Sequence, residues 1–302
     1  MKMKFAHPRC ALKLGPTHAA WVDVSSRWWG RSRHHAQQID LPAGLLRPSP
    51  GELNITNETL LLERLRAVVA RRSRWLSLRP IVLILSDMCV RSRLLELEEV
   101  PATRIERDAL IRWRLDKEAF FPMAGTRVVT QMVGPKTVLA IVIRETVLEQ
   151  YEAICRAAGL VAVDIDIAGF RLCNLSMSLV PAQQTVAWLS LLDGGFSLII
   201  LRDRRPAFIR TKVQARSTPD AVLHDLQHSL AYCHERLGIG EIHRLILVAT
   251  SADAELEDLL GIELGLKVVR PDWKKMPPKA RLPINDPNHA GMLAAAAGVF
   301  GS

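Results

Sequence analysis

The first ninety residues contain short apolar runs separated by turn-forming residues. Residues 11–26, ALKLGPTHAAWVDVSS, hold two such runs on either side of Gly15-Pro16, and this pattern predicts a β-hairpin. In residues 57–70 the apolar positions recur at helical spacing behind Asn57, which predicts a helix with an asparagine N-cap. Residues 79–87, RPIVLILSD, form a short apolar run after a proline, as expected of a buried central strand.

Residues 90–160 have a pattern of their own, which indicates a strand, a helix, two strands and a second helix. The first helix is expected to begin after a cap at Thr103 and to end at Pro122, because proline cannot continue a helix. The second is expected to run from a cap at Thr146 to Gly159, a residue type that favours the position after a helix end. This segment predicts a small α+β domain inserted into the chain.

The second half of the chain repeats the order of the first. Residues 160–170 predict a strand, and residues 185–211 predict three strands with a tight turn at Gly194-Gly195. An amphipathic helix is expected over residues 220–238, followed by a buried strand, a short helix, an edge strand and a last helix that extends to Phe300. Each half thus holds a hairpin whose turn can face a phosphate, as two lobes around a nucleotide cleft require.

We therefore predict an α/β protein of two lobes. The expected boundaries are a first lobe at residues 1–89, an inserted subdomain at 90–160 and a second lobe at 161–302, whose last helix returns to the first. A chain of 302 residues is long enough for such an arrangement. Its least charged stretch, residues 172–201, holds a proline and two adjacent glycines, so we expect a soluble protein without a membrane-spanning helix.

Charge and cysteines add constraints on partners and compartment. The net charge is +9, with arginines clustered in residues 27–33 and 64–74; a basic face can meet nucleic acid, the anionic inner leaflet of a membrane, or solvent alone. The five cysteines are scattered singly. Because none forms a CxxC pair, we expect reduced, buried thiols in a cytoplasmic protein.

Four segments resemble one known family. Residues 110–122, LIRWRLDKEAFFP, are similar to the helix end IRWEAEQYIPFP of the actin-like type IV pilus assembly family PilM, whose relatives act in mannose-sensitive haemagglutinin pilus and type II secretion biogenesis. Residues 147–174 resemble its helix and strand YLELLEAAGLKPVAVDVEAFAL, residues 191–211 its second phosphate hairpin, and residues 292–301 its closing helix. The division protein FtsA is more distantly similar.

The resemblance implies an actin-like (RNase H-like) fold with an inserted 1C (SHS2-like) subdomain. It implies a cytoplasmic scaffold of pilus or secretion-system assembly that belongs to a peripheral inner-membrane complex. The inserted module would bind the cytoplasmic tail of a small PilN-like inner-membrane protein. No specific nucleic acid is implied, and homo-oligomerisation stays open.

The resemblance also maps two phosphate-binding turns onto the chain. The first turn carries Gly15 and Thr17, with Lys13 where the family has an acidic residue and Pro16 where a backbone N–H is lost. The second turn carries four candidate phosphate-binding residues, Asp193, Gly194, Gly195 and Ser197. It also has Phe196 where the family has a small residue.

A third element departs from the family as well, since residues 249–251 are Ala-Thr-Ser where the adenosine motif has glycines. We therefore predict a degenerate nucleotide site with no catalytic residue and no bound metal. ATP with Mg²⁺ is disfavoured as a cofactor, although a lysine at position 13 can contact a phosphate directly. The alternatives are an active actin-like ATPase that switches the assembly apparatus and, on charge alone, a nucleic-acid-binding protein.

Three further groups of residues are open to a functional or a structural interpretation. His224 and His228 have the spacing of helical metal ligands, but no HExxH motif is present, so we expect surface or interface histidines. Asp164 and Asp166 point to the same side of a strand, and we expect a structural role for them. Of the tryptophans, Trp75, Trp113 and Trp188 are expected in cores or lobe contacts, and Ile105 and Ala109 share a helical face with Trp113; an exposed tryptophan near the inserted module would be an interface candidate.

Overall fold

A computed structural model of the chain describes residues 8–26, 32–69, 78–118, 123–213, 218–249 and 254–273, together with residues 287, 289 and 292. The first sheet has five strands in the order β3-β2-β1-β4-β8. The hairpin β1–β2 and its neighbour β3 are antiparallel, whereas β4 and β8 run parallel to β1. The bounds are β1 (Cys10–Leu14), β2 (His18–Ser26), β3 (Ser32–Asp40), β4 (Arg79–Leu85) and β8 (Leu160–Ile167).

The second sheet repeats this topology strand for strand, in the order β11-β10-β9-β12-β13. Its first three strands are antiparallel, and the last two run parallel to β9. The bounds are β9 (Thr185–Ser190), β10 (Gly195–Arg202), β11 (Arg205–Val213), β12 (Arg244–Val248) and β13 (Lys267–Val269). The predicted two-lobed α/β fold is therefore confirmed.

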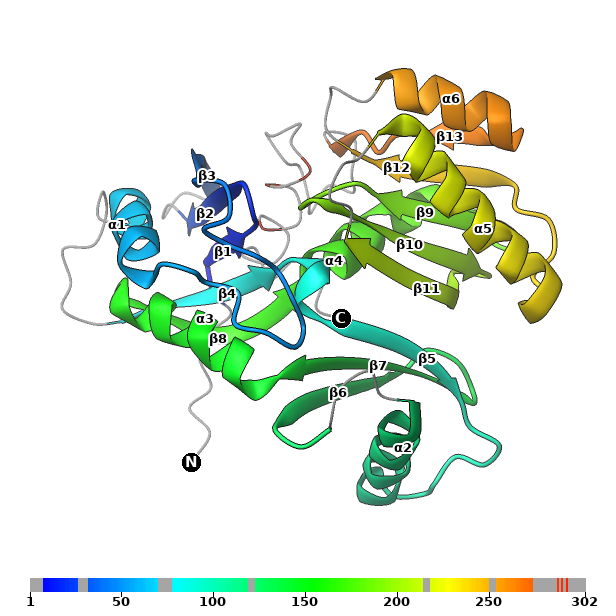
Figure 1. The fold of residues 1–302 in the computed structure, drawn as a ribbon, viewed down its shortest axis with the longest axis horizontal. Coiled ribbons are helices and arrows are strands. Elements are labelled where there is room, and N and C mark those ends of the chain that lie inside the picture. Colours follow the sequence, from blue (N-terminus) through cyan, green and yellow to red (C-terminus); the bar gives the residue numbers. More distant parts are fainter. Residues whose placement is uncertain are drawn as a thin grey trace.

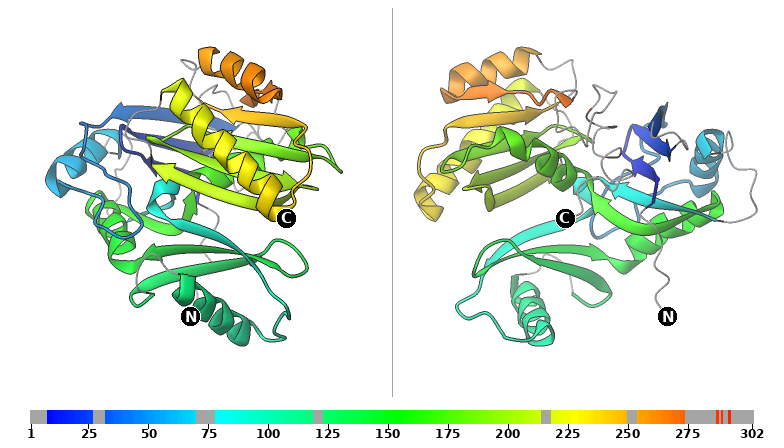
Figure 2. Two further views of the ribbon diagram at one scale, coloured as in Figure 1. Left: turned by 45° about the vertical axis from the view of Figure 1, so that its right-hand side comes forward. Right: turned by 180° about the vertical axis from the view of Figure 1, so that it is seen from behind.

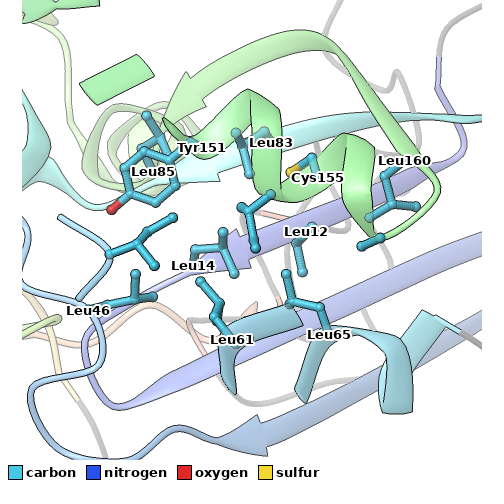
Figure 3. Packing of buried hydrophobic residues seen from close by; sticks show 14 of the residues in the cluster. Leu12, Leu14, Leu46, Leu61, Leu65, Leu83, Leu85, Tyr151, Cys155 and Leu160 are labelled. Atoms are coloured by element: carbon cyan, nitrogen blue, oxygen red, sulfur yellow. The ribbon is translucent and has the colours of Figure 1, made fainter. Parts of the chain in front are cut away.

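Helices cover the outer face of each sheet (Figures 1 and 2). The helices α1 (Glu58–Val69) and α3 (Glu145–Ala157) pack on the first sheet. Figure 3 shows leucines of α1, and Tyr151 and Cys155 of α3, beside the leucines of β1 and β4. The helices α5 (Pro219–Leu237) and α6 (Ala254–Leu264) pack on the second. The expected cap of α1 is present, since the Asn57 side chain accepts from the Leu60 N–H at 3.0 Å.

The inner faces of the two sheets share one apolar cluster. Residues of β1, β2 and β4 meet residues of β9, β10 and β12 there, around the short helix α4 (Ala168–Leu175). Trp188 of β9 is fully buried in this cluster, and its indole N–H donates to the Ser176 hydroxyl at 3.4 Å. Ser176 begins a 3₁₀ turn, η2 (Ser176–Leu179). The lobes are thus joined by a continuous core, as expected for Trp188.

A third, three-stranded sheet in the order β5-β7-β6 forms the inserted module, with α2 (Arg104–Glu118) on one face. Its bounds are β5 (Arg91–Glu96), β6 (Thr126–Met132) and β7 (Thr137–Arg144). The expected cap of α2 is present as a capping box, because the Thr103 hydroxyl accepts from the Glu106 N–H at 3.2 Å and the Glu106 carboxylate accepts from the Thr103 N–H at 3.4 Å.

The domain boundaries differ from the expected ones at 160. Strand β8 pairs with β4, so the strand assigned to the second lobe completes the first sheet. Helix α3, assigned to the inserted module, packs in the core of the first lobe. It begins at Glu145 behind Arg144, so Thr146 is not its cap, but Gly159 follows its end with the expected positive φ of 80°.

The buried face of α2 also differs from the expected one. Ile111 and Leu115 point into the module, whereas Ile105 is 83% exposed and Trp113 is 55% exposed. The Lys117 ammonium lies 3.7 Å from the Trp113 ring centroid, which is a cation–π contact. Trp113 is therefore not a core residue but an exposed aromatic side chain on the module, and by the sequence argument an interface candidate.

Some expectations concern residues beyond those described. These are Trp75, most of the arginine clusters, Pro122, residues 250–251 and most of the last helix. Within the described part, all five cysteines are free and buried. No helix there is long and apolar enough to span a membrane.

Candidate functional site: two hairpin turns joined by a buried ion pair

The first candidate turn connects β1 to β2. The Gly15 N–H donates to the His18 carbonyl at 3.0 Å, which closes the turn predicted around Gly15-Pro16. Thr17 is exposed at the tip of this turn, and its hydroxyl is 3.1 Å from the His18 ring. Lys13 lies one residue before the end of β1 and is almost completely buried.

The second candidate turn connects β9 to β10. Asp193 and Gly194 have φ values of 61° and 73°, the left-handed pair that a two-residue type I′ hairpin requires. The tight turn is thus Asp193-Gly194 instead of the expected Gly194-Gly195. Gly195 begins β10, where an added Cβ would lie 2.6 Å from the Lys212 carbonyl and 2.8 Å from the Met88 sulfur. This glycine permits a close approach between the two lobes.

A buried ion pair joins the two turns. The Lys13 Nζ atom lies 2.9 Å from Asp193 Oδ1, and both side chains are only 2% exposed. The residues are separated by 180 positions in sequence and belong to different lobes. A Cβ on Gly15 would stand 2.5 Å from the same Asp193 oxygen, so a larger residue there would push the Asp193 carboxylate out of this position. Lysine and aspartate thus neutralise each other at the position where the resemblance implies phosphate and metal.

Asp87 is a third ionisable group at this position, and it was not identified from the sequence. It begins the 3₁₀ turn η1 (Asp87–Cys89) directly after β4, and its carboxylate accepts from the Gly169 N–H of α4 at 3.1 Å. Burial, and then the neighbouring Asp193 carboxylate, raise the pKa of Asp87 to about 7. Lys13 lowers the pKa of Asp87 but does not offset these effects, since its ammonium is in direct contact with Asp193.

The raised pKa gives a testable dependence of stability on pH. Between the ordinary value of 3.8 and about 7, the folded chain holds a proton on Asp87 that the unfolded chain has released. Its contribution to stability is therefore complete at low pH and is lost as the pH rises through about 7. We measure the free energy of unfolding with urea at about pH 5.5 and about pH 8, a range that includes the titration of Asp87 in the folded chain. We expect it to fall more over this range in the natural chain than in Asp87→Asn. Equal pH slopes in the two chains would contradict this assignment.

Of the remaining candidate residues, one lies beside Asp87 and the others pack into the core of the second lobe. Ser197 is buried on β10 beside Asp87. Phe196 points away from it into the core under α5, together with Leu198 and Ile200. Because side chains of a strand alternate between its faces, Phe196 points away from the position where the resemblance implies a phosphate. Ala249 is half-buried after β12 and packs against the same core.

The other expected structural roles can be placed as well. Asp166 of β8 binds Arg171 of α4 through an ion pair and accepts from the Ile167 N–H. His224 and His228 both lie exposed on α5, with their Nε2 atoms 3.1 Å apart. Among the described residues, no group of three or more histidines, cysteines or acidic residues is arranged to hold a metal ion.

A groove, here called the β5–β11 groove, separates the inserted module from the second lobe. It has a volume of about 1150 Å³. Strand β5 is an edge of the third sheet, β11 is an edge of the second, and the two lie side by side (Figure 1). The groove is lined by both strands, by the turn after β6 and by α5, and its charged residues include Arg93, Arg202, Arg205, Arg210, Glu96, Asp203 and Asp225.

The α5 wall of the groove is fixed to β11 by charged contacts. Both carboxylate oxygens of Asp225 accept from the Lys212 ammonium, at 2.7 and 2.8 Å. Arg210 donates to the Ser229 hydroxyl at 2.8 Å. Asp225 is buried and bound to Lys212 and Arg210, so basic residues of β11 neutralise its negative charge in this wall of the groove.

Comparisons with known proteins place the fold. No protein-family model matches the chain, and no curated protein matches its sequence. Among solved structures, the PilM–PilN type IV pilus biogenesis complex contains a chain with a TM-score of 0.75 at 18% identity, with 98% of this chain and 97% of that chain covered. The expected resemblance to PilM is thus confirmed at the level of the fold.

Two other solved structures are similar. A Bacteroides thetaiotaomicron protein with an actin-like ATPase fold and unknown function has a TM-score of 0.57 at 11% identity, with 97% and 99% of the two chains covered. The cytoplasmic domain of EpsL, an inner-membrane component of the Vibrio cholerae type II secretion system, has a TM-score of 0.54 at 10% identity, with 97% and 95% covered. At these identities the likeness shows an actin-like fold.

Proposed function

We propose that this chain is a cytoplasmic platform protein of a type IV pilus or a related secretion apparatus. It binds the cytoplasmic tail of a small inner-membrane protein and works without ATP hydrolysis. The observation that carries the proposal is the likeness over nearly the whole chain to a pilus biogenesis protein solved with its partner. A second similar structure, from a secretion system, belongs to an inner-membrane component.

The ion pair between the turns supports a platform that does not depend on nucleotide. A Mg²⁺–phosphate group at this position would have to displace Lys13 from Asp193, to which it is bound at 2.9 Å. Separating a buried ion pair is costly because each charge loses its partner in a medium of low dielectric constant. In the proposed protein the lysine supplies the positive charge, and the continuous core around Trp188 holds the lobes together.

The β5–β11 groove supports binding of an extended tail. It is bounded by the outer edges of two strands, and within the described residues neither edge is paired in a sheet. Free strand edges bind an extended peptide through backbone hydrogen bonds, while the side chains around them select its sequence. The groove lies beside the inserted module, which the resemblance implies in partner binding.

The proposal is tested with the cytoplasmic tail of a bitopic membrane protein encoded next to this chain. A fluorescent peptide of that tail is expected to bind the full chain saturably, as measured by anisotropy. Arg205→Glu, on β11 in the groove, is expected to weaken binding by about tenfold or more, because a charge of the wrong sign at an interface costs up to several kcal/mol. Arg64→Glu, on the exposed side of α1, is the matched control and is expected to leave the affinity unchanged.

Two outcomes would contradict this part of the proposal. One is the absence of saturable binding by a correctly folded chain. The other is an equal loss of affinity in the Arg64→Glu control, which would assign the binding to net charge instead of the groove.

An ATP-driven switch is the second candidate function. It is favoured by Asp87 and Asp193, whose carboxyl groups lie at the lobe contact and are the type of oxygen ligand that Mg²⁺ prefers. In that case Mg-ATP binding would have to break the Lys13 contact. The nucleotide titration described at the end of the Discussion separates the two candidates.

A further inference from the structure

The histidine pair on α5 has a geometry that its sequence spacing alone does not fix. The Nε2 atoms of His224 and His228 lie 3.1 Å apart, and the ring centroids lie 4.3 Å apart. Because the centroids are farther apart than the nitrogens, the two rings converge on their Nε2 edges. Both residues are exposed and line the β5–β11 groove, so solvent and solutes reach the convergent edge.

We propose that His224 and His228 together bind a divalent transition-metal ion, with zinc, copper and nickel as the chemical class. Imidazole nitrogens bind such ions at about 2.0–2.1 Å. Two nitrogens 3.1 Å apart, each at such a distance from one ion, enclose an angle of about 100° at that ion. This angle lies between those of neighbouring ligands in square-planar and in tetrahedral coordination, so small rotations of the rings suffice for either.

The ion takes the place of a shared proton. Without metal, the Nε2–H of one ring can donate to the other Nε2 across the 3.1 Å gap when the two rings are in opposite tautomers. In the metal-bound pair both rings carry their proton on Nδ1, and both Nε2 lone pairs bind the ion. No third metal ligand stands beside them among the described residues, so the remaining coordination positions are open to water or to a donor in the groove. A role for that donor in tail docking rests on the proposed function, but metal binding does not.

The test is a calorimetric titration of the full chain, free of any polyhistidine tag, with Zn²⁺ and separately with Cu²⁺, Ni²⁺ and Co²⁺. Saturable binding is expected in the affinity order Cu²⁺ above Ni²⁺ above Co²⁺, the general order for nitrogen ligands. His224→Gln and His228→Gln are each expected to weaken it by about tenfold or more, because either change leaves a single imidazole. His234→Gln is the matched control, because His234 is an exposed histidine of the same helix outside the lining of the groove.

Two further measurements do not depend on calorimetry. Bound Cu²⁺ is expected to show two nitrogen ligands by electron paramagnetic resonance, and added imidazole is expected to increase that number. Metal is also expected to raise the unfolding temperature of the natural chain but not of His228→Gln, because it binds the folded state. The proposal is overturned if the natural chain binds no metal saturably, or if His234→Gln loses as much affinity as His224→Gln.

Failure of this test leaves the tail-binding proposal intact, because the peptide titration contains no metal. Conversely, if the chain binds metal through the histidine pair but binds no tail peptide, the metal site is supported and the proposed function is contradicted.

Discussion

Lys13→Met is expected to lower the free energy of unfolding by about 3–5 kcal/mol, as breaking a buried ion pair on one side does. Methionine fills a similar volume but leaves the Asp193 carboxylate buried without its partner at 2.9 Å. It also removes the cation that offsets the charge of Asp87. Urea unfolding at neutral pH, followed by circular dichroism, measures the effect.

The double variant Lys13→Met with Asp193→Asn is the decisive control. Asparagine tolerates the positive φ of 61° at this turn, so the turn is kept while the uncompensated charge is removed. The double variant is therefore expected to recover most of the lost stability. If Lys13→Met changes stability by less than about 1 kcal/mol, the pair behaves like an exposed one and the account of the site is wrong.

Trp188→Ala is expected to destabilise the chain by about 3–5 kcal/mol, the usual cost of removing a buried aromatic side chain. Trp188 is fully buried where the inner faces of both sheets meet α4. Its loss leaves a cavity between the lobes and deprives the Ser176 hydroxyl of its 3.4 Å contact with the indole. The expected consequence is looser coupling of the lobes, seen as faster amide hydrogen exchange in β9 and α4.

Trp113→Ala is the matched control for this prediction, since Trp113 is more than half exposed on α2. The change is expected to alter stability by less than about 1 kcal/mol. Equal destabilisation by the two substitutions would contradict the assignment of Trp188 to the core that joins the lobes.

Much of the fold could be predicted because it is encoded locally. The helix α1 has its apolar spacing and its Asn57 cap within a single segment, and the hairpins have turn residues between apolar runs. The duplicated order of elements then gave the two sheets. The boundary near residue 160 could not be predicted in this way, because it depends on which core α3 packs against and on which strand β8 pairs with.

The face of α2 shows a further limit of sequence patterns. The helix has two sets of apolar residues, one with Ile105 and Trp113 and the other with Ile111 and Leu115, and only the second is buried. Helical periodicity cannot decide between two such faces, because each repeats at the spacing of a helix. The partner surface that decides is the third sheet, which is formed by strands that come before and after α2 in the sequence.

The candidate site was predicted in parts. The two turns and the unusual Lys13 could be identified from aligned residues, but its contact with Asp193 spans 180 positions and needs the packed lobes. One sequence feature could have identified Asp87. It is an acidic residue just after a buried parallel strand, where the ligand sites of open sheets lie. The direction in which Phe196 points, to the far face of β10, follows from strand alternation once the first residue of that strand is known.

A calorimetric titration of the full chain with Mg-ATP at physiological salt tests the central claim most directly, namely that the Lys13–Asp193 pair has replaced nucleotide. The account predicts no saturable heat up to millimolar Mg-ATP, both in the natural chain and in the Arg64→Glu control. Saturable binding at micromolar Mg-ATP, weakened by Asp193→Asn, would contradict it and would make the chain a nucleotide-controlled switch.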